Sequence, residues 1–199
     1  MNYNLSVFQE PRGVMRIIQF IFSICAFATI SGYSSAYKYI CDNKQYNETI
    51  EYPFRIDLPT GQENSSGDLS SDAQFFVATG VLSFLYCIFV VLLYVVCDEL
   101  YKQNTQIPLL DFGLTVVLAV FWLSGSAAWA NGLNGLKLIT NLEDKCTITA
   151  PLNFSTLNIS VILGFLNFFL WASDLWFLYK ETTWFQIKQS TSGPITPTV

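Results

Sequence analysis

Four long stretches of this sequence carry almost no charge, and they restrict the possible folds more than any other feature. Three contain no charged residue at all, namely 17–37, 73–97 and 112–136. A fourth, 159–179, contains a single one, Asp174. A helix needs about 20 mainly apolar residues to cross the hydrocarbon core of a membrane. The sequence therefore predicts four membrane-spanning helices, at about 15–36, 74–97, 109–132 and 159–180.

A soluble helical bundle and a cleaved leader are the two alternatives to this interpretation. Helices of a soluble bundle show a polar stripe every three or four residues, but 75–96 offers only Thr79, Ser83 and two tyrosine hydroxyls. Charged residues make up 13% of the chain, against about 25% in a typical soluble domain. The first apolar stretch also exceeds the roughly 7–15 residues of a signal-peptide core. These observations favour a membrane protein that retains its first helix.

The two longer loops, at about 37–73 and 133–158, indicate the orientation. Basic residues do not, because five lie on each side of the membrane in the predicted topology. Each loop carries one cysteine, and a Cys41–Cys146 disulfide would form in an oxidising compartment. The loops also contain glycosylation sequons, which are weak signals individually, at Asn47, Asn64 and Asn153. We therefore expect both loops on the lumenal or exterior side and both termini in the cytoplasm.

Two carboxylates lie in or beside the predicted spans. A carboxylate within a span costs roughly 2.5–3.5 kcal/mol on insertion scales, so Asp174 needs either interfacial water near Lys180 or a basic partner on a neighbouring helix. An ion or proton pathway is the less favoured alternative for it. Asp111 follows Pro108, and we expect it to cap the start of the third helix, where a carboxylate complements the helix dipole.

A patch of small residues interrupts the third span between Trp122 and Trp129. Small side chains let helices approach closely in lipid, where packing drives association. The patch therefore predicts a contact between helices, either within the bundle or between protomers, and Asn167 in the fourth span is expected to hydrogen-bond across helices. The predicted contact residues are Ser124, Gly125, Ser126, Ala127, Asn167 and Asp174.

Composition argues against several classes of function. The chain has no histidine, which removes the usual general base and the commonest metal ligand. A net charge of −5 argues against nucleic acid as a partner, since binding needs a basic face. We expect no enzyme activity, no metal and no cofactor. Among junctional four-span proteins, the cysteine patterns of tetraspanins, connexins and claudins are absent from the sequence.

Several motifs, in order along the chain, resemble those of the synaptophysin family. They are Glu10-Pro-Arg-Gly, the CAFATISGYSS stretch from Cys25, Glu51-Tyr-Pro-Phe-Arg, Ser70-Ser-Asp-Ala-Gln-Phe-Phe-Val, Pro108-Leu-Leu-Asp-Phe, Trp122-Leu-Ser-Gly-Ser-Ala-Ala-Trp-Ala, Gly164-Phe-Leu-Asn-Phe-Phe-Leu-Trp and Leu175-Trp-Phe-Leu-Tyr-Lys-Glu-Thr. The resemblance implies an all-α, MARVEL-like four-transmembrane-helix bundle over 14–182, between cytoplasmic segments 1–13 and 183–199. At the position of Asp174, family members usually have a neutral polar residue.

The resemblance also implies a function. A synaptophysin-like protein would be a non-enzymatic, oligomeric component of synaptic or other transport vesicles. It would organise the vesicle membrane and bind cholesterol and the vesicle SNARE synaptobrevin. An oligomeric ion channel or transporter in the same membrane is the alternative, although such a pore needs a polar stripe along a helix.

Overall fold

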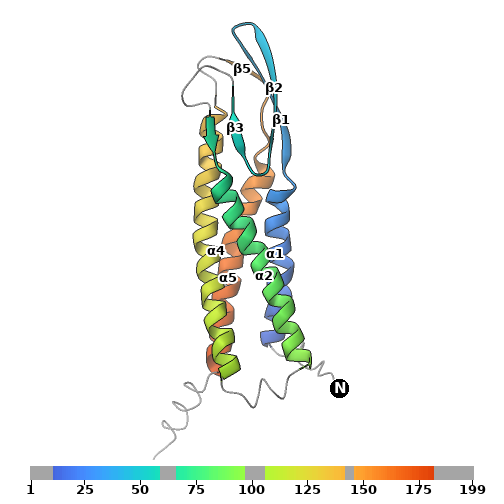
Figure 1. Ribbon diagram of the computed structural model, residues 1–199, viewed down its shortest axis with the longest axis vertical. Helices are drawn as coiled ribbons and strands as arrows, with labels where there is room; N and C mark the ends of the chain where they lie inside the picture. The colour runs from blue at the N-terminus through green and yellow to red at the C-terminus, as the bar shows by residue number, and fades with distance from the viewer. Residues whose placement is uncertain (1–10, 59–65, 97–105, 142–145, 182–199) are drawn as a thin grey trace, which may run out of the picture.

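Four long helices lie side by side as a bundle (Figure 1). They are α1 (Pro11–Ser31), α2 (Ser70–Val96), α4 (Gln106–Ile139) and α5 (Ser155–Glu181). The computed structural model describes residues 11–58, 66–96, 106–141 and 146–181. All four helices are long and apolar enough to cross a membrane. The predicted four-helix membrane bundle is confirmed.

The outer surface of the bundle is strongly apolar. Phe89 on α2, Leu110 on α4 and Ile162 on α5 are all largely exposed. The core, by contrast, contains polar side chains, among them Ser83 and Asn167, both fully buried. Soluble proteins keep large apolar side chains mostly inside. This reversed distribution indicates that lipid surrounds the four helices.

The helix ends differ from the predicted spans. The first helix stops at Ser31 rather than near 36, because the chain is extended in a strand from Ser34 onward. The third continues to Ile139 instead of 132, and its 34 residues span about 51 Å. A hydrocarbon core is only about 30 Å thick. Uncharged stretches therefore mark the part of a helix that crosses lipid, whereas the helix itself continues into the headgroup region.

Much of the two expected loops is β-structure, which the pattern of uncharged stretches does not predict. β1 (Ser34–Cys41) and β2 (Lys44–Glu51) form an antiparallel hairpin, and β5 (Thr147–Ala150) pairs with the other edge of β1. The hairpin turns through Asp42 and Asn43, both with positive φ, as two-residue hairpin turns require. β3 (Arg55–Asp57) and β4 (Ser66–Asp68) form a second, two-stranded sheet.

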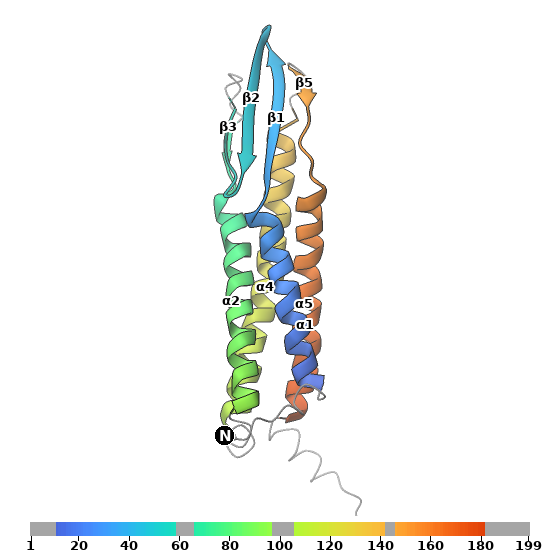
Figure 2. The same cartoon turned by 90° about the vertical axis from the view of Figure 1, so that its right-hand side faces the viewer.

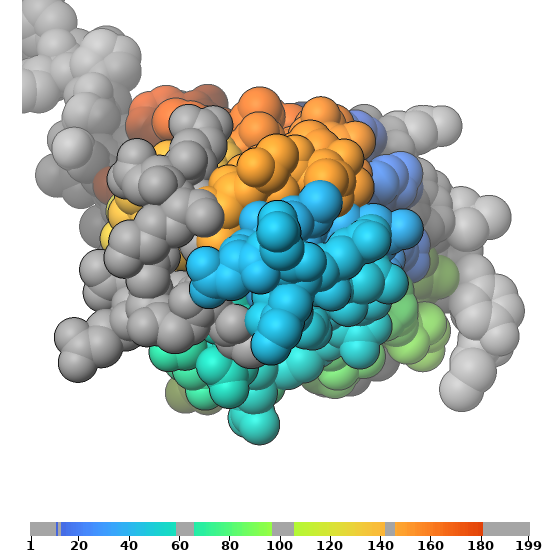
Figure 3. Space-filling view, turned by 90° about the horizontal axis from the view of Figure 1, so that it is seen from above, coloured from blue at the N-terminus to red at the C-terminus, as the bar shows by residue number. Residues whose placement is uncertain are grey.

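The sheets lie at one end of the bundle, and α1 begins and α5 ends at the other (Figure 2). In the view from above, the hairpin and the β5 segment lie against each other over that end (Figure 3). Aromatic packing fixes the sheet region to the helices, since the ring of Phe54 lies 5.1 Å from that of Trp129 on α4. Tyr37 adds a hydrogen bond of 2.6 Å from its hydroxyl to the carbonyl of Thr140.

At Gly164, α5 packs closely against its neighbours. A Cβ added there would lie 2.5 Å from Cε2 of Phe76 and closer still to Oγ of Ser126. We expect Gly164→Ala to destabilise the bundle by about 1–3 kcal/mol through overpacking, measured as a lower melting temperature in detergent by circular dichroism. Gly113→Ala is the matched control, because no atom of the described residues lies within 4 Å of its added Cβ. Equal melting temperatures for the two variants would contradict the close contact.

Candidate functional site

The guanidinium of Arg16 is buried at the centre of an ion cluster within the bundle. Its Nη2 lies 2.8 Å from Oδ1 of Asp111 on α4, and its Nη1 lies 3.0 Å from Oδ2 of Asp174 on α5. Arg16 and Asp174 are both 0% exposed. One cation of α1 therefore joins α1 to two other helices. The cluster lies toward the end of the bundle away from the sheets, within about 10 Å of the helix ends.

Neutral side chains complete this arrangement, which we call the Arg16 cluster. Gln19 accepts a hydrogen bond of 2.9 Å from Nη1 of Arg16 and donates one of 3.1 Å to Oδ2 of Asp174. Thr115 accepts from Nη2 of Arg16 at 2.8 Å. From α2, the hydroxyls of Tyr86 and Tyr94 both donate to Asp111. All four helices therefore contribute. The cluster consists of Arg16, Gln19, Tyr86, Tyr94, Asp111, Thr115 and Asp174.

Aromatic rings enclose the cation. The guanidinium carbon of Arg16 lies 5.3 Å from the ring centroids of both Tyr86 and Trp171, within cation–π range. A buried charge is tolerated only when it is paired and hydrogen-bonded, and removing one partner of such a pair costs about 3–5 kcal/mol. The geometry thus makes Arg16 a fixed link between helices.

The structure distinguishes the two alternatives for Asp174 and corrects the expectation for Asp111. Asp174 pairs with a basic residue on a neighbouring helix, Arg16 on α1. Lys180 lies over the ring of Trp176 at 5.2 Å. Asp111 is not a helix cap, because α4 begins five residues earlier at Gln106. Arg16 directly precedes the first uncharged stretch, yet its side chain is fully buried within the bundle. The spacing of Arg16, Gln19 and Ser23 along one helix face was the available signal.

The patch of small residues on α4 divides between two faces. Gly125 and Ser126 face the interior, and a Cβ on Gly125 would lie 3.6 Å from the ring of Phe75 on α2. Ser124 and Ala127 are exposed on the outer surface. Asn167 is fully buried, and its amide donates to the carbonyl of Phe22 on α1 at 3.1 Å. The expected hydrogen bond between helices is therefore present at Asn167.

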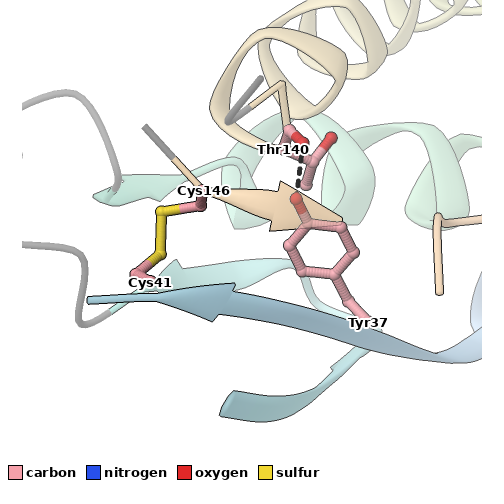
Figure 4. Close-up of a disulfide and its surroundings, with 4 residues drawn as sticks. All are labelled: Tyr37, Cys41, Thr140 and Cys146. Atoms are coloured by element: carbon pink, nitrogen blue, oxygen red, sulfur yellow. Dashed lines mark hydrogen bonds between the residues drawn. A yellow bond between two sulfur atoms is a disulfide. The ribbon is translucent and has the colours of Figure 1, made fainter. Parts of the chain in front are cut away.

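A disulfide joins Cys41 at the end of β1 to Cys146 just before β5, with a Cα–Cα distance of 4.6 Å (Figure 4). It reinforces the pairing of two strands that are distant in sequence. Tyr37 lies nearby, and burial, with Tyr39 close to it, raises the pKa of Tyr37 to about 12. Its hydroxyl consequently remains protonated and donates to Thr140 at neutral pH.

The three predicted glycosylation sites have different surroundings. Asn47 is exposed on β2, opposite Lys38. Asn153 accepts a hydrogen bond of 2.9 Å from the backbone N–H of Ser155, which starts α5, so its side chain acts as a cap. Asn64 lies outside the described residues. Both described positions are exposed, and they differ in that Asn153 is engaged at the start of a helix whereas Asn47 lies on a strand.

These features define a four-helix membrane protein with an ion cluster inside the bundle and a disulfide-linked sheet at one end. The family profile MARVEL, described as a membrane-associating domain, matches residues 8–177. The match covers most of the chain, which therefore belongs to the MARVEL family.

Proposed function

We propose that this chain is a non-enzymatic protein of synaptic or other transport vesicles, which organises the membrane by binding a synaptobrevin-type SNARE and cholesterol within the bilayer. Membership of the MARVEL family supports the membrane association. The ordered motifs that resemble the synaptophysin family support the vesicle location and the two partners. The part of the chain that the structure describes exposes little outside the membrane except the sheets, so the helices offer the larger surface for partners.

An exposed face of α4 is the observation that carries this proposal. Six residues at alternating spacings of four and three lie on its outer surface, which is the repeat of a coiled-coil seam. Three of the six, a glycine, a serine and an alanine, are small, as in helix contacts within lipid. We call this set the α4 seam: Gly113, Val117, Val120, Ser124, Ala127 and Asn131. The helix of a single-span SNARE could pack along it, as could α4 of a second protomer.

A groove beside the same face supports a sterol as the second ligand. It has a volume of about 780 Å³, and its described lining is apolar except for Gln106. Gly113 and Val117 belong to both the groove and the α4 seam. A sterol combines rigid apolar rings with a single hydroxyl, and small-molecule sites of this size are typically apolar with few polar groups.

Site-specific crosslinking in cells tests this function. A photoreactive amino acid in place of Ala127 on the α4 seam is expected to crosslink to synaptobrevin in a vesicle fraction. The same probe in place of Ile162, which is 65% exposed on α5, is the matched control and is expected to give no such product. Residence in the plasma membrane, or equal yields from the two positions, would contradict the proposal.

An ion channel is the less well supported function. Arg16 and Asp174 are fully buried and paired with each other. Within the described part of a single bundle, the Arg16 cluster therefore fills the interior at its level and leaves no water-filled path there. Reproducible selective conductance in planar bilayers, abolished by Asp174→Asn, would reverse this ranking.

The proposed orientation, with the sheets in the lumen, makes a prediction at Asn47. Its side chain is exposed on β2, so it is expected to carry a glycan in a eukaryotic host. Asn47→Gln should increase electrophoretic mobility to the extent that one N-glycan accounts for, and glycosidase treatment of the wild type should abolish that difference. Thr49→Ser is the matched control, because serine at this position preserves the sequon and should preserve the wild-type mobility. Unchanged mobility of Asn47→Gln would contradict glycosylation at this position.

A further inference from the structure

We propose that Asp174 is a proton-binding site within the membrane and that it holds one proton on its Oδ1 atom. This site goes beyond the proposed function and does not depend on it. It follows from the position of one carboxylate oxygen within the Arg16 cluster.

The two oxygens of Asp174 have different surroundings. Oδ2 lies 3.0 Å from Nη1 of Arg16 and accepts a hydrogen bond of 3.1 Å from Gln19. Oδ1 is buried, and no group in the described part of the chain forms a hydrogen bond with it. The whole residue is 0% exposed. Oδ2 thus accepts from two donors, whereas Oδ1 accepts from none in the described part of the chain.

An ionised carboxylate is unfavourable in free energy at a buried position where one of its oxygens accepts no hydrogen bond from the described residues. Burial of a charge without compensating hydrogen bonds is so unfavourable that the group usually neutralises instead. A neutral hydroxyl without a partner is far less unfavourable in the same place. Protonation at Oδ1 also leaves Oδ2 able to accept from Arg16 and Gln19. Protonation forms an O–H bond at Oδ1 and breaks one in hydronium, which becomes water. Nothing is oxidised or reduced.

A proton suits this position better than a metal ion. The cationic guanidinium of Arg16 already occupies the space next to Oδ2 and would repel a metal cation. Within the described residues, no group of three or more potential metal ligands is found. A proton needs no coordination shell. Water at the near end of the bundle could supply it, since Lys180 is six residues away, about 9 Å along the helix.

Charged and titratable groups from every neighbouring helix face this site. Arg16 from α1 pairs with Asp174, and the carboxylate of Asp111 from α4 shares that cation. Loss of the proton would place a second negative charge on the same guanidinium, so proton occupancy is coupled to the contact of α1 with α5. The full set among the described residues is Arg16 on α1, Tyr86, Cys87 and Tyr94 on α2, and Asp111 on α4.

Infrared spectroscopy of the full chain in phosphatidylcholine vesicles at neutral pH tests the proposal. The wild type is expected to show the carbonyl band of a protonated carboxylic acid, which shifts in heavy water. Asp174→Asn should lose this band. Asp57→Asn, at an exposed position on β3, should retain it. An unchanged band in Asp174→Asn, or no such band in the wild type, would show that Asp174 is ionised and would overturn the proposal.

A second variant covers the case in which Asp174→Asn does not fold. Asp174→Glu keeps a carboxyl group, and a glutamic acid absorbs at a different frequency from an aspartic acid. A band displaced in Asp174→Glu assigns the proton to this position. A band at the wild-type frequency in a folded Asp174→Glu protein would assign it elsewhere and reject the site.

Discussion

Arg16→Met is expected to lower the free energy of unfolding by about 3–5 kcal/mol, because it removes the cation from a buried pair and leaves a carboxylate without it. The guanidinium contacts Asp111 at 2.8 Å and Asp174 at 3.0 Å, and it is fully buried. Methionine retains much of the apolar side-chain volume but cannot donate a hydrogen bond to Asp111 or Asp174. Thermal unfolding in detergent, followed by circular dichroism together with size-exclusion chromatography, measures the effect.

Arg55→Met is the matched control for this loss. Arg55 also pairs with an aspartate, but Nε lies 3.9 Å from Asp68 and the side chain is 71% exposed. Exposed ion pairs contribute little, so we expect a change within about 0.5 kcal/mol. Arg16→Lys should rescue only part of the loss, since an ammonium cannot bridge two carboxylates as a planar guanidinium does.

Neutralising the whole cluster distinguishes charge imbalance from loss of packing. In a variant that combines Arg16→Met with Asp111→Asn and Asp174→Asn, no charge of the triad remains to be compensated. Removing one partner of a buried ion pair is strongly destabilising because it leaves an uncompensated charge, and the triple variant leaves none. The triple variant should therefore be more stable than Arg16→Met alone. If Arg16→Met were as stable as the wild type, the ion pairs would not hold the helices together.

The helices were predictable because lipid imposes a requirement on every residue of a span. A helix in hydrocarbon satisfies its own backbone, and its outer surface must be apolar, so uncharged stretches locate it. The same criterion concealed the Arg16 cluster. The first uncharged stretch starts at 17, one residue after Arg16. A span boundary placed at the nearest charged residue therefore leaves Arg16 outside the membrane. What permits its burial is a carboxylate 95 residues away, which no local pattern reveals.

The sheet had a local signal that the membrane interpretation left unused. In β1, Tyr37, Tyr39 and Cys41 are buried, while Lys38 between them is exposed, and this alternation is typical of a strand with one buried face. The pairing of β1 with β5 is a different matter. Ile40 lies opposite Thr147, and only the fold of the bundle brings these segments together. The sequence could indicate the cysteine pair between these two segments, but not the pairing of the strands.

A double variant, Cys41→Ser with Cys146→Ser, is expected to lose about 2–5 kcal/mol, the usual cost of removing a native disulfide from a small domain. The loss should be confined to the sheet region. Lipid holds each helix in place independently of the strands, so helical circular dichroism should be unchanged. In sealed vesicles whose sheet regions face the added protease, the double variant should be cleaved faster than the wild type.

Cys25→Ser separates this effect from the mere loss of a thiol, because Cys25 is unpaired and exposed on α1; it should be cleaved at the wild-type rate. Without the disulfide, β5 is held by its short pairing with β1 and by neighbouring contacts such as the hydrogen bond from Tyr37 to Thr140. A four-residue edge strand is marginal alone. Wild-type resistance in the double variant would show that these contacts suffice and that the disulfide adds little to the folded state.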